Sequence, residues 1–324
     1  MPKKADAFLA IAVALFSQVN EAKDARTVTA WLHQRDWAAA VESVQQHAKL
    51  IAEVAPAWYM ISPEGRVIAI PKAFVNDAQL VDIARANGII LRPLVGTADT
   101  KVESVLPILR DRARRAAHAK ELADLVVWGH YDGIDLDYEG IRMPELEQLA
   151  SLVEELAAAL HREGKTLAVS LEVQGSDGVI PSWMRIGKVA DSVRLMTYGS
   201  KPARPGPIME LDKMRLHLER ALKAIPVQKL SHGIAIYGLD WSPNVGSGTW
   251  MQYQVRADEQ RITPLVDAAS KMSRYTDLRG IVQYENAQSV GEKVRIARAL
   301  GIQKFAFWRL GGEDSGIWNL FRSP

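Results

Sequence analysis

Eight short, mostly apolar segments recur along the chain, and most are separated by longer segments in which the apolar residues follow helical spacing. The predicted strands are 28–31, 57–61, 89–95, 134–139, 167–171, 192–198, 230–237 and 304–308. The predicted helices are 38–54, 78–87, 102–128, 143–162, 212–224 and 290–300. Strands that are apolar on both faces form parallel sheets covered by helices. Eight such units in 324 residues predict an α/β fold, a (β/α)8 TIM barrel, rather than a doubly wound sheet.

Two boundaries depart from this regular alternation. The segment 242–284 follows the seventh strand without helical or strand periodicity, and we expect a small insertion or lid before the eighth strand within a barrel domain of residues 25–324. Near the other end of the chain, Pro56 is predicted to close the first helix because proline lacks a backbone N–H.

The first residues, 1–24, have the layout of a secretory signal peptide. Lys3 and Lys4 precede an apolar run at 7–16, and polar residues follow it. That run is too short to span a bilayer. The competing interpretation is an N-terminal amphipathic helix that packs on the domain. We expect export to the periplasm, the cell wall or the medium, with a cytoplasmic location as the alternative.

The amino-acid composition limits the kinds of binding partner that we expect for this protein. The net charge is +2, with 40 basic and 38 acidic residues, so we expect no nucleic-acid partner. The chain has no cysteine, which excludes disulfides and thiolate metal sites. No pair of histidines has metal-ligand spacing, and we therefore expect neither a metal nor a cofactor. The predicted assembly is a monomer.

The segment 131–139 reads Tyr-Asp-Gly-Ile-Asp-Leu-Asp-Tyr-Glu, and from residue 134 onward apolar and acidic residues alternate. The period of two places Asp135, Asp137 and Glu139 on one face of a strand. Residues two apart lie about 6.6 Å from each other, so at an effective dielectric of about 20 their charges repel by about 2.5 kcal/mol. We expect this face to hold a proton at neutral pH, which equips it for general acid catalysis. The alternative, a solvated edge strand, conflicts with the bulky apolar residues on the other face.

Chemistry in a barrel of this type is carried by residues at the C-terminal ends of the strands. This rule places Glu139, Tyr198, Tyr237 and Trp308 around one mouth of the predicted barrel. Asp132 lies at the start of its strand, where a carboxylate can accept backbone N–H groups, so we expect it to have a structural role.

The acidic segment resembles the signature of glycoside hydrolase family 18, Asp-x-x-Asp-x-Asp-x-Glu at the end of the fourth barrel strand. Asp132, Asp135, Asp137 and Glu139 occupy its required positions. The resemblance extends over residues 28–321.

Further segments carry the same resemblance. Residues 196–198, Met-Thr-Tyr, are similar to the family's Met-x-Tyr on strand six, and residues 233–238 are similar to its segment on strand seven. Trp308 stands where a tryptophan usually floors the sugar site. Gly199 replaces the aspartate that usually follows the strand-six tyrosine, so one polar contact is lost.

Other segments are similar to the family branch that includes bacterial spore-cortex and germination proteins, which are associated with peptidoglycan rather than bulk chitin. These segments are 205–207, 307–314 and 317–318. The substrate implied by the resemblance is therefore an N-acetylated polysaccharide or oligosaccharide of the peptidoglycan or chitin type.

The resemblance implies retaining hydrolysis of β-1,4 bonds next to N-acetylglucosamine. Glu139 would protonate the glycosidic oxygen while the substrate's own 2-acetamido carbonyl attacks the anomeric carbon, and would then act as base for water. Asp137 would orient the acetamido N–H, and Asp135 would tune it through a shared proton. Tyr198 would donate to the acetamido oxygen. The substrate-binding residues implied by the resemblance are Trp308, Met196, Tyr237 and Trp31.

Some of these interpretations have alternatives. Trp31 and Trp58 are candidates for stacking on sugars but equally for filling the barrel core. Gly199 also leaves room for a catalytically weak or inactive glycan-binding protein on the same barrel. A third possibility is a metal-dependent hydrolase that uses the acidic cluster to bind Mg²⁺ or Ca²⁺.

Overall fold

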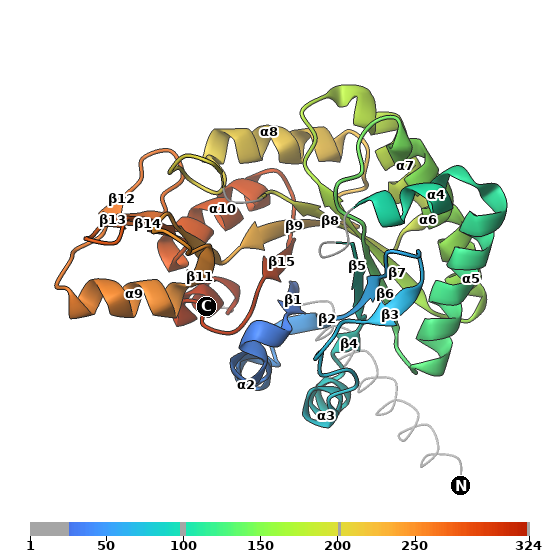
Figure 1. Ribbon diagram of the computed structural model, residues 1–324, viewed down its shortest axis with the longest axis horizontal. Coiled ribbons are helices and arrows are strands. Elements are labelled where there is room, and N and C mark those ends of the chain that lie inside the picture. The colour runs from blue at the N-terminus through green and yellow to red at the C-terminus, as the bar shows by residue number, and fades with distance from the viewer. Residues whose placement is uncertain (1–25, 98–101, 200–201, 323–324) are drawn as a thin grey trace, which may run out of the picture.

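The structure is a computed structural model that describes residues 26–97, 102–199 and 202–322 (Figure 1). The predictions for residues 1–24 lie outside the described residues.

The centre of the fold is a closed barrel of parallel strands, which confirms the predicted TIM barrel. The ring closes because β1 pairs with both β2 and β15, and every neighbouring pair around it is parallel. The third position of the ring is shared by two short strands, β4 and β5, which both pair with β2. In chain order the barrel strands are β1 (Val28–Leu32), β2 (Ile51–Ile61), β4 (Ile90–Leu91) with β5 (Leu94–Gly96), β6 (Gly133–Asp137), β7 (Thr166–Glu172), β8 (Ser192–Met196), β9 (Leu230–Ala235) and β15 (Lys304–Trp308).

Helices cover the outside of the barrel (Figure 1). They are α2 (Trp37–His47), α3 (Ala78–Asn87), α4 (Leu106–Arg110), α5 (Arg112–Trp128), α6 (Glu145–Arg162), α7 (Ile180–Val189), α8 (Leu211–Leu222) and α10 (Ala287–Ala299). The smaller elements are β3 (Val67–Ala69), which pairs with β2, and the 3-10 helices Gln34–Asp36, Val102–Ser104, Asp177–Val179 and Ser315–Phe321. Gly88 ends α3 in the left-handed region, at φ 57°, which glycine adopts without steric cost.

The predicted helix 38–54 is wrong in its C-terminal part. α2 ends at His47, and the chain then forms β2, which runs through Pro56 instead of ending before it. Pro56 lies opposite Leu32 of β1 in the ladder. β2 is buried along most of its length, and a short apolar run buried on both faces lacks the periodicity that would distinguish a strand from a helix.

Two helical segments also differ from the prediction. The segment 102–128 is divided because Asp111 has an extended backbone and its side chain accepts a hydrogen bond from Arg114 N, which caps the start of α5. The second difference is α7, a helix that was not predicted at all. It contains Pro181 and Gly187, two residue types with poor helix propensity, although proline is tolerated in the first turn of a helix.

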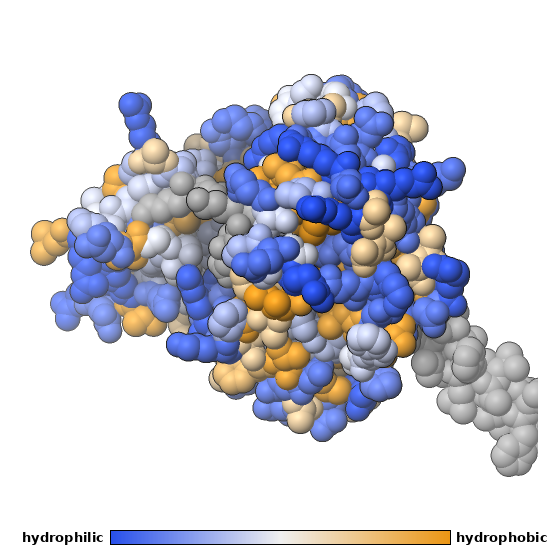
Figure 2. Space-filling model, turned by 45° about the vertical axis from the view of Figure 1, so that its right-hand side comes forward, coloured by the Kyte–Doolittle hydropathy of each residue, from blue (hydrophilic) through white to orange (hydrophobic). Residues whose placement is uncertain are grey.

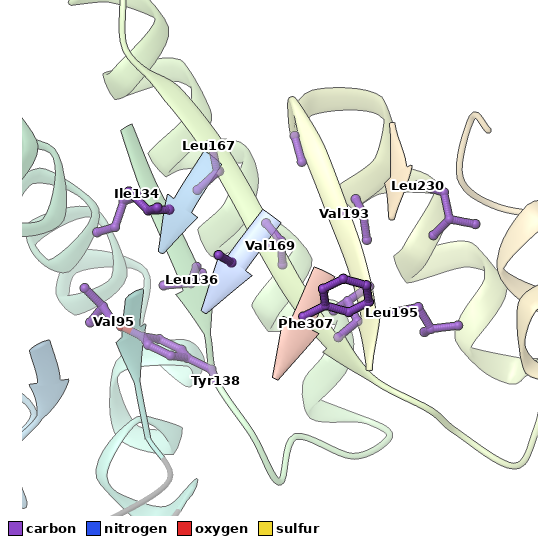
Figure 3. Close-up of a cluster of buried hydrophobic side chains, with 14 of the residues drawn as sticks. Val95, Ile134, Leu136, Tyr138, Leu167, Val169, Val193, Leu195, Leu230 and Phe307 are labelled. Atoms are coloured by element: carbon purple, nitrogen blue, oxygen red, sulfur yellow. The ribbon is translucent and has the colours of Figure 1, made fainter. Parts of the chain in front are cut away.

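The strand β6 has the alternation that its sequence predicts. Figure 3 shows Ile134, Leu136 and Tyr138 in the apolar layer together with residues of the neighbouring strands. This layer also contains the buried residues of α6, so it fills the space between barrel and helices. Asp135 and Asp137 alternate with these residues and therefore point into the barrel. A smaller apolar cluster inside the barrel includes Trp31, Ala55, Ala57, Leu94, Met196 and Ala306.

The segment between β9 and α10 forms a second, antiparallel sheet (Figure 1, orange). It begins at Tyr237 rather than at residue 242. Its elements are β10 (Tyr237–Asp240), β11 (Ser247–Thr249), α9 (Trp250–Glu259), β12 (Leu265–Val266), β13 (Ser273–Thr276) and β14 (Ile281–Tyr284). Arg256 of α9 donates to Asp240 at 2.5 Å and to Asp277 at 2.6 Å, which ties the helix to the sheet. The role of this insertion as a lid stays a prediction.

The surface carries no continuous apolar band on the face that Figure 2 shows, where hydrophobic residues form separate patches among hydrophilic ones. Within the described ranges, no helix combines the length and the apolar character needed to cross a membrane.

Candidate active site

A pocket of about 180 Å³ lies at the C-terminal ends of the barrel strands. Its walls come from the ends of β1, β6, β7, β8 and β15 and from the first residue of the insertion. The lining residues are Trp31, Asp137, Glu139, Glu172, Met196, Tyr198, Gly199, Tyr237 and Trp308. The structure therefore brings together seven of the predicted site residues, all except Asp135 and Asp132.

Glu139 follows the last residue of β6 and is partly exposed to the pocket. Its backbone is held on both sides. The N–H of Glu139 donates to Thr97 Oγ1 at 2.9 Å, and the N–H of Gly140 donates to Glu172 Oε2 at 2.7 Å. These bonds fix the position from which the Glu139 side chain enters the pocket.

Glu172 was not predicted as a site residue. Its Oε2 also accepts a hydrogen bond from Arg142 Nη1 at 2.9 Å, so the carboxylate joins the end of β7 to the loop after Glu139. The only sequence signal for it was its place at the C-terminal end of an apolar strand.

Asp137 is buried, and burial is the main cause that raises its pKa well above the usual value. The negative charges of Glu139, Asp135 and Glu172 raise this pKa further, in that order, and Arg194 opposes them. Asp137 Oδ1 has no hydrogen-bond partner in the part of the chain that the structure describes. Burial and the neighbouring negative charges thus favour the protonated form of Asp137, and its Oδ1 is left without a partner among the described residues.

Asp135 lies below the pocket and does not line it. Its carboxylate accepts hydrogen bonds from three side chains. Trp31 Nε1 donates at 2.8 Å and Ser170 Oγ at 3.0 Å, and the guanidinium of Arg194 forms an ion pair with Oδ2.

Tyr198 brings a second unpaired polar group to the pocket. Its hydroxyl is buried and has no hydrogen-bond partner among the described residues. Burial, followed by the charge of Asp137, raises the pKa of Tyr198 well above its usual value, so the hydroxyl keeps its proton and is a donor. Met196 lies at the end of the same strand, where it packs in the apolar cluster inside the barrel.

Gly199 leaves open space beside these residues. A Cβ built on it would meet no heavy atom of the described residues within 4 Å. Tyr237 donates to the backbone oxygen of Gly199 at 3.4 Å, and its ring stands edge-on to Tyr198 at 6.5 Å. The position is therefore compatible with a larger side chain.

The tryptophans have different environments. Trp308 is half-buried and meets Trp31 edge-on, with ring centroids 6.1 Å apart. Trp31 is 1% exposed and bonded to Asp135, so it forms the pocket floor rather than a free stacking surface. Trp58 is fully buried beside Trp37 and Tyr131, away from the pocket. Of the two roles predicted for Trp58, the structure therefore supports that of a core residue.

Asp132 lies at the opposite end of β6 from the pocket. Its Oδ2 accepts a hydrogen bond from the backbone N–H of Leu91 at 2.8 Å, which is the kind of contact that the sequence led us to expect for this carboxylate. Across residues 26–97, 102–199 and 202–322, no group of three or more His, Asp or Glu side chains is arranged to hold a metal ion.

Comparison with known proteins finds relatives in sequence and in fold. The cortical fragment-lytic enzyme of Bacillus subtilis (strain 168) is 28% identical over 207 residues, 58% of this chain and 48% of that protein. The spore cortex-lytic enzyme SleL of Bacillus megaterium QM B1551 superposes with a TM-score of 0.79 at 21% identity, over 91% of this chain and 73% of that chain. A class V chitinase from Pseudomonas fluorescens Pf-5 gives 0.81 at 23% identity, over 91% and 98%. The two solved structures show the fold alone.

The family assignment rests on a match that covers most of the chain. The model of the glycosyl hydrolases family 18 matches residues 26–313. This range contains all barrel strands and every residue that lines the pocket. The chain therefore belongs to glycosyl hydrolases family 18.

Proposed function

We propose that this protein is a retaining hydrolase of β-1,4 bonds in N-acetylglucosamine-containing glycans, with a nucleophile supplied by the substrate. The observation that carries the proposal is a pair of unpaired polar atoms beside Glu139. Asp137 Oδ1 and the Tyr198 hydroxyl both lack partners among the described residues. Buried polar atoms are normally hydrogen-bonded, so an unpaired donor and acceptor in one pocket indicate a ligand that completes them.

An acetamido group has the complementary chemistry. Its N–H can donate to Asp137, and its carbonyl oxygen can accept from Tyr198. Held in this way, the carbonyl oxygen is placed to attack the anomeric carbon of its own sugar, and no enzyme carboxylate needs to form a covalent bond.

Proton transfer in this proposal involves the neighbouring acids. Glu139 protonates the glycosidic oxygen as the bond breaks. The proton held at rest by Asp137 is available to Glu139, and its loss leaves Asp137 negative, which stabilises the positive charge of the cyclic intermediate. Glu139 then accepts a proton from the attacking water, so the configuration at the anomeric carbon is retained.

The aromatic residues supply the sugar-binding surface. Trp308 is half-buried at the rim, and Trp31 closes the floor of the pocket beneath it. Aromatic faces of this kind pack against the apolar faces of sugar rings. We infer that the ring bearing the acetamido group sits over Trp308.

The relatives support the proposed substrate class. A cortical fragment-lytic enzyme and a spore cortex-lytic enzyme are among the similar proteins, as is a class V chitinase. We therefore propose peptidoglycan or chitin-type glycans as substrates, and action outside the cytoplasm, where such polymers lie.

The test is hydrolysis of a chromogenic chito-oligosaccharide and of purified peptidoglycan, with the anomer of the fresh product read by NMR. Release of the β-anomer first supports retention, and release of the α-anomer contradicts the proposed mechanism. Turnover that persists in excess chelator would dismiss the metal-dependent alternative.

A glycan-binding protein without turnover is the second candidate. Gly199 favours it because the open space there lacks the carboxylate that the family usually has. Binding of the oligosaccharide with no product over a long incubation would select this candidate, and measurable turnover would remove it.

A further inference from the structure

A chain of four alternating charges runs through the interior of the barrel beneath the pocket. Arg194 of β8 pairs with Asp135 of β6 and with Glu53 of β2. Glu53 Oε2 also accepts from Arg92 Nη1 at 2.7 Å. Arg92 Nε donates to Thr166 Oγ1 at 2.8 Å, which anchors the far end of the chain on β7. We refer to Asp135, Arg194, Glu53 and Arg92 as the buried quartet.

The buried quartet is almost completely removed from water. Arg194 and Asp135 are each 0% exposed, Glu53 is 5% exposed and Arg92 is 6% exposed. Its two acids and two bases cancel, so the group as a whole is neutral. Burial alone lowers the pKa of Arg194, but the charges of Asp135 and Glu53 outweigh this effect and the net shift is upward. Arg194 is therefore a permanent cation directly below the site.

Stability alone does not account for such a group. Desolvation of buried ion pairs offsets much of their attraction, and apolar residues of similar volume stabilise a core as well or better. Barrel interiors are usually filled by layers of branched apolar side chains. An arginine at this depth therefore suggests a role in the chemistry of the acids above it.

The contacts of Asp135 point to that role. Its two oxygens receive donors from Trp31, Ser170 and Arg194. Protonation of Asp135 would leave the buried Arg194 guanidinium next to a neutral group and would weaken two charge-assisted contacts, those with Arg194 and Trp31. By contrast, Asp137 faces Glu139, Asp135 and Glu172, and its Oδ1 has no donor among the described residues.

We propose that Arg194 is a positioning residue that keeps Asp135 deprotonated, so that the proton needed by the acidic face resides only on Asp137 and Glu139. This inference rests on the proposed function because the proton matters only if Glu139 is the general acid. It replaces the sequence-based hypothesis in which Asp135 shares that proton. Asp135 then acts as a fixed negative charge, and Asp137 as the group that gains and loses the proton.

The groups that face these acids come from several strands around the barrel. Asp135 faces Trp31 of β1, Ser170 of β7 and Arg194 of β8, and Glu53 of β2 reaches it through Arg194. Asp137 faces the acids named above, and Arg194 lowers its pKa in opposition to them. The buried hydroxyl of Tyr198 completes the pocket side.

The first test reads the protonation state directly in the wild-type protein. Aspartate is labelled with ¹³C at Cγ, and the Asp135 signal is assigned by its loss in Asp135→Asn. We expect that signal to stay at the ionised position from about pH 5 to about pH 8, the range in which an aspartate that shares a proton with a neighbouring acid titrates. Titration of Asp135 within this range overturns the proposal. The measurement needs no turnover, so it stands apart from any failure of the proposed function.

The second test removes the cation without leaving a net charge in the core. Arg194→Met combined with Glu53→Gln takes away one base and one acid of the quartet. Asp135 and Asp137 then share a proton without a neighbouring cation, and protons bind the acidic face more tightly. With the chromogenic chito-oligosaccharide, we expect the acidic limb of the kcat profile to move up by about one pH unit or more.

The matched control is Arg92→Met combined with Glu53→Gln, which also removes one base and one acid but leaves the Arg194–Asp135 pair in place. Its pH profile should coincide with that of the wild type. Equal shifts in both double variants, or no shift in either, would overturn the proposal. Circular dichroism and thermal unfolding verify that each variant folds, and if the Arg194 double variant does not fold, the NMR titration decides alone.

Discussion

Replacement of Glu139 by glutamine is the most direct perturbation of the proposed mechanism. Glutamine has nearly the same shape but cannot carry the proton. The backbone at this position is held by Thr97 and, through Gly140, by Glu172, and neither contact uses the Glu139 side chain. We therefore expect Glu139→Gln to fold normally and to keep its affinity for the oligosaccharide.

The expected loss follows from the number of proton transfers. General acid–base catalysis is typically worth about 10²–10⁴-fold per step, or about 2.7–5.5 kcal/mol. In the proposed mechanism Glu139 serves both halves of the reaction, so kcat should fall by about 10⁴-fold or more. The other pocket acids are poor substitutes. Glu172 Oε2 accepts from Gly140 N–H and from Arg142, and the proposed role of Asp137 is to hold the acetamido group.

The assay is release of the chromophore from the chito-oligosaccharide, with binding measured separately by calorimetry. Asp132→Asn is the matched control, because Asp132 lies on the same strand segment but outside the pocket. The control should retain turnover close to that of the wild type. Activity of Glu139→Gln above about a tenth of the wild-type value would refute the assignment of Glu139 as the general acid.

Three further predictions test the neighbouring groups. Activity should follow a bell-shaped pH profile, and Asp135→Asn should move its acidic limb to lower pH, because it removes a negative charge that raises the pKa of Asp137; an unmoved profile would contradict this. An oligosaccharide with a free amine in place of the 2-acetamido group should bind but lose turnover by several orders of magnitude, since effective molarities of well-oriented groups reach about 10⁵ M or more; comparable rates would mean that a protein carboxylate attacks. Lys293→Met should lower the free energy of unfolding by about 3–5 kcal/mol in urea, because it leaves the buried Glu285 without its cation, and a loss below about 1 kcal/mol would refute that account.

The barrel was predictable because two sequence signals mark each of its strands. Each is a short apolar run, and each is followed by a helix or a turn signal that limits its length. β6 carried the clearest pattern, since its alternation gives both the strand and the direction of Asp135 and Asp137. The failures lie where a pattern is ambiguous by nature. β2 is buried on both faces and could be taken for the end of a helix, and α7 contains Pro181 and Gly187.

The candidate site was predictable in its residues but not in its partners. Strand ends can be placed around one mouth from the order of the elements, so Tyr198, Tyr237 and Trp308 could be brought to Glu139 without coordinates. Glu172 was missed because a single acid after an apolar strand is common. No spacing relates Asp135 to Arg194, which lies 59 residues further along the chain.

The three acids of β6 have similar intrinsic chemistry, and their sequence pattern treats them alike. Their surroundings divide them. Asp135 accepts hydrogen bonds from three donors, one of them the buried cation Arg194. Asp137 faces other acids, and its Oδ1 has no partner among the described residues. Glu139 reaches the open pocket. A carboxyl group's proton affinity is decided by such neighbours. The differences in proton affinity among the three acids are therefore set by residues of β1, β7 and β8 rather than by the sequence of β6 itself. Changing Arg194 should therefore alter the reaction's pH dependence, although Arg194 does not line the pocket.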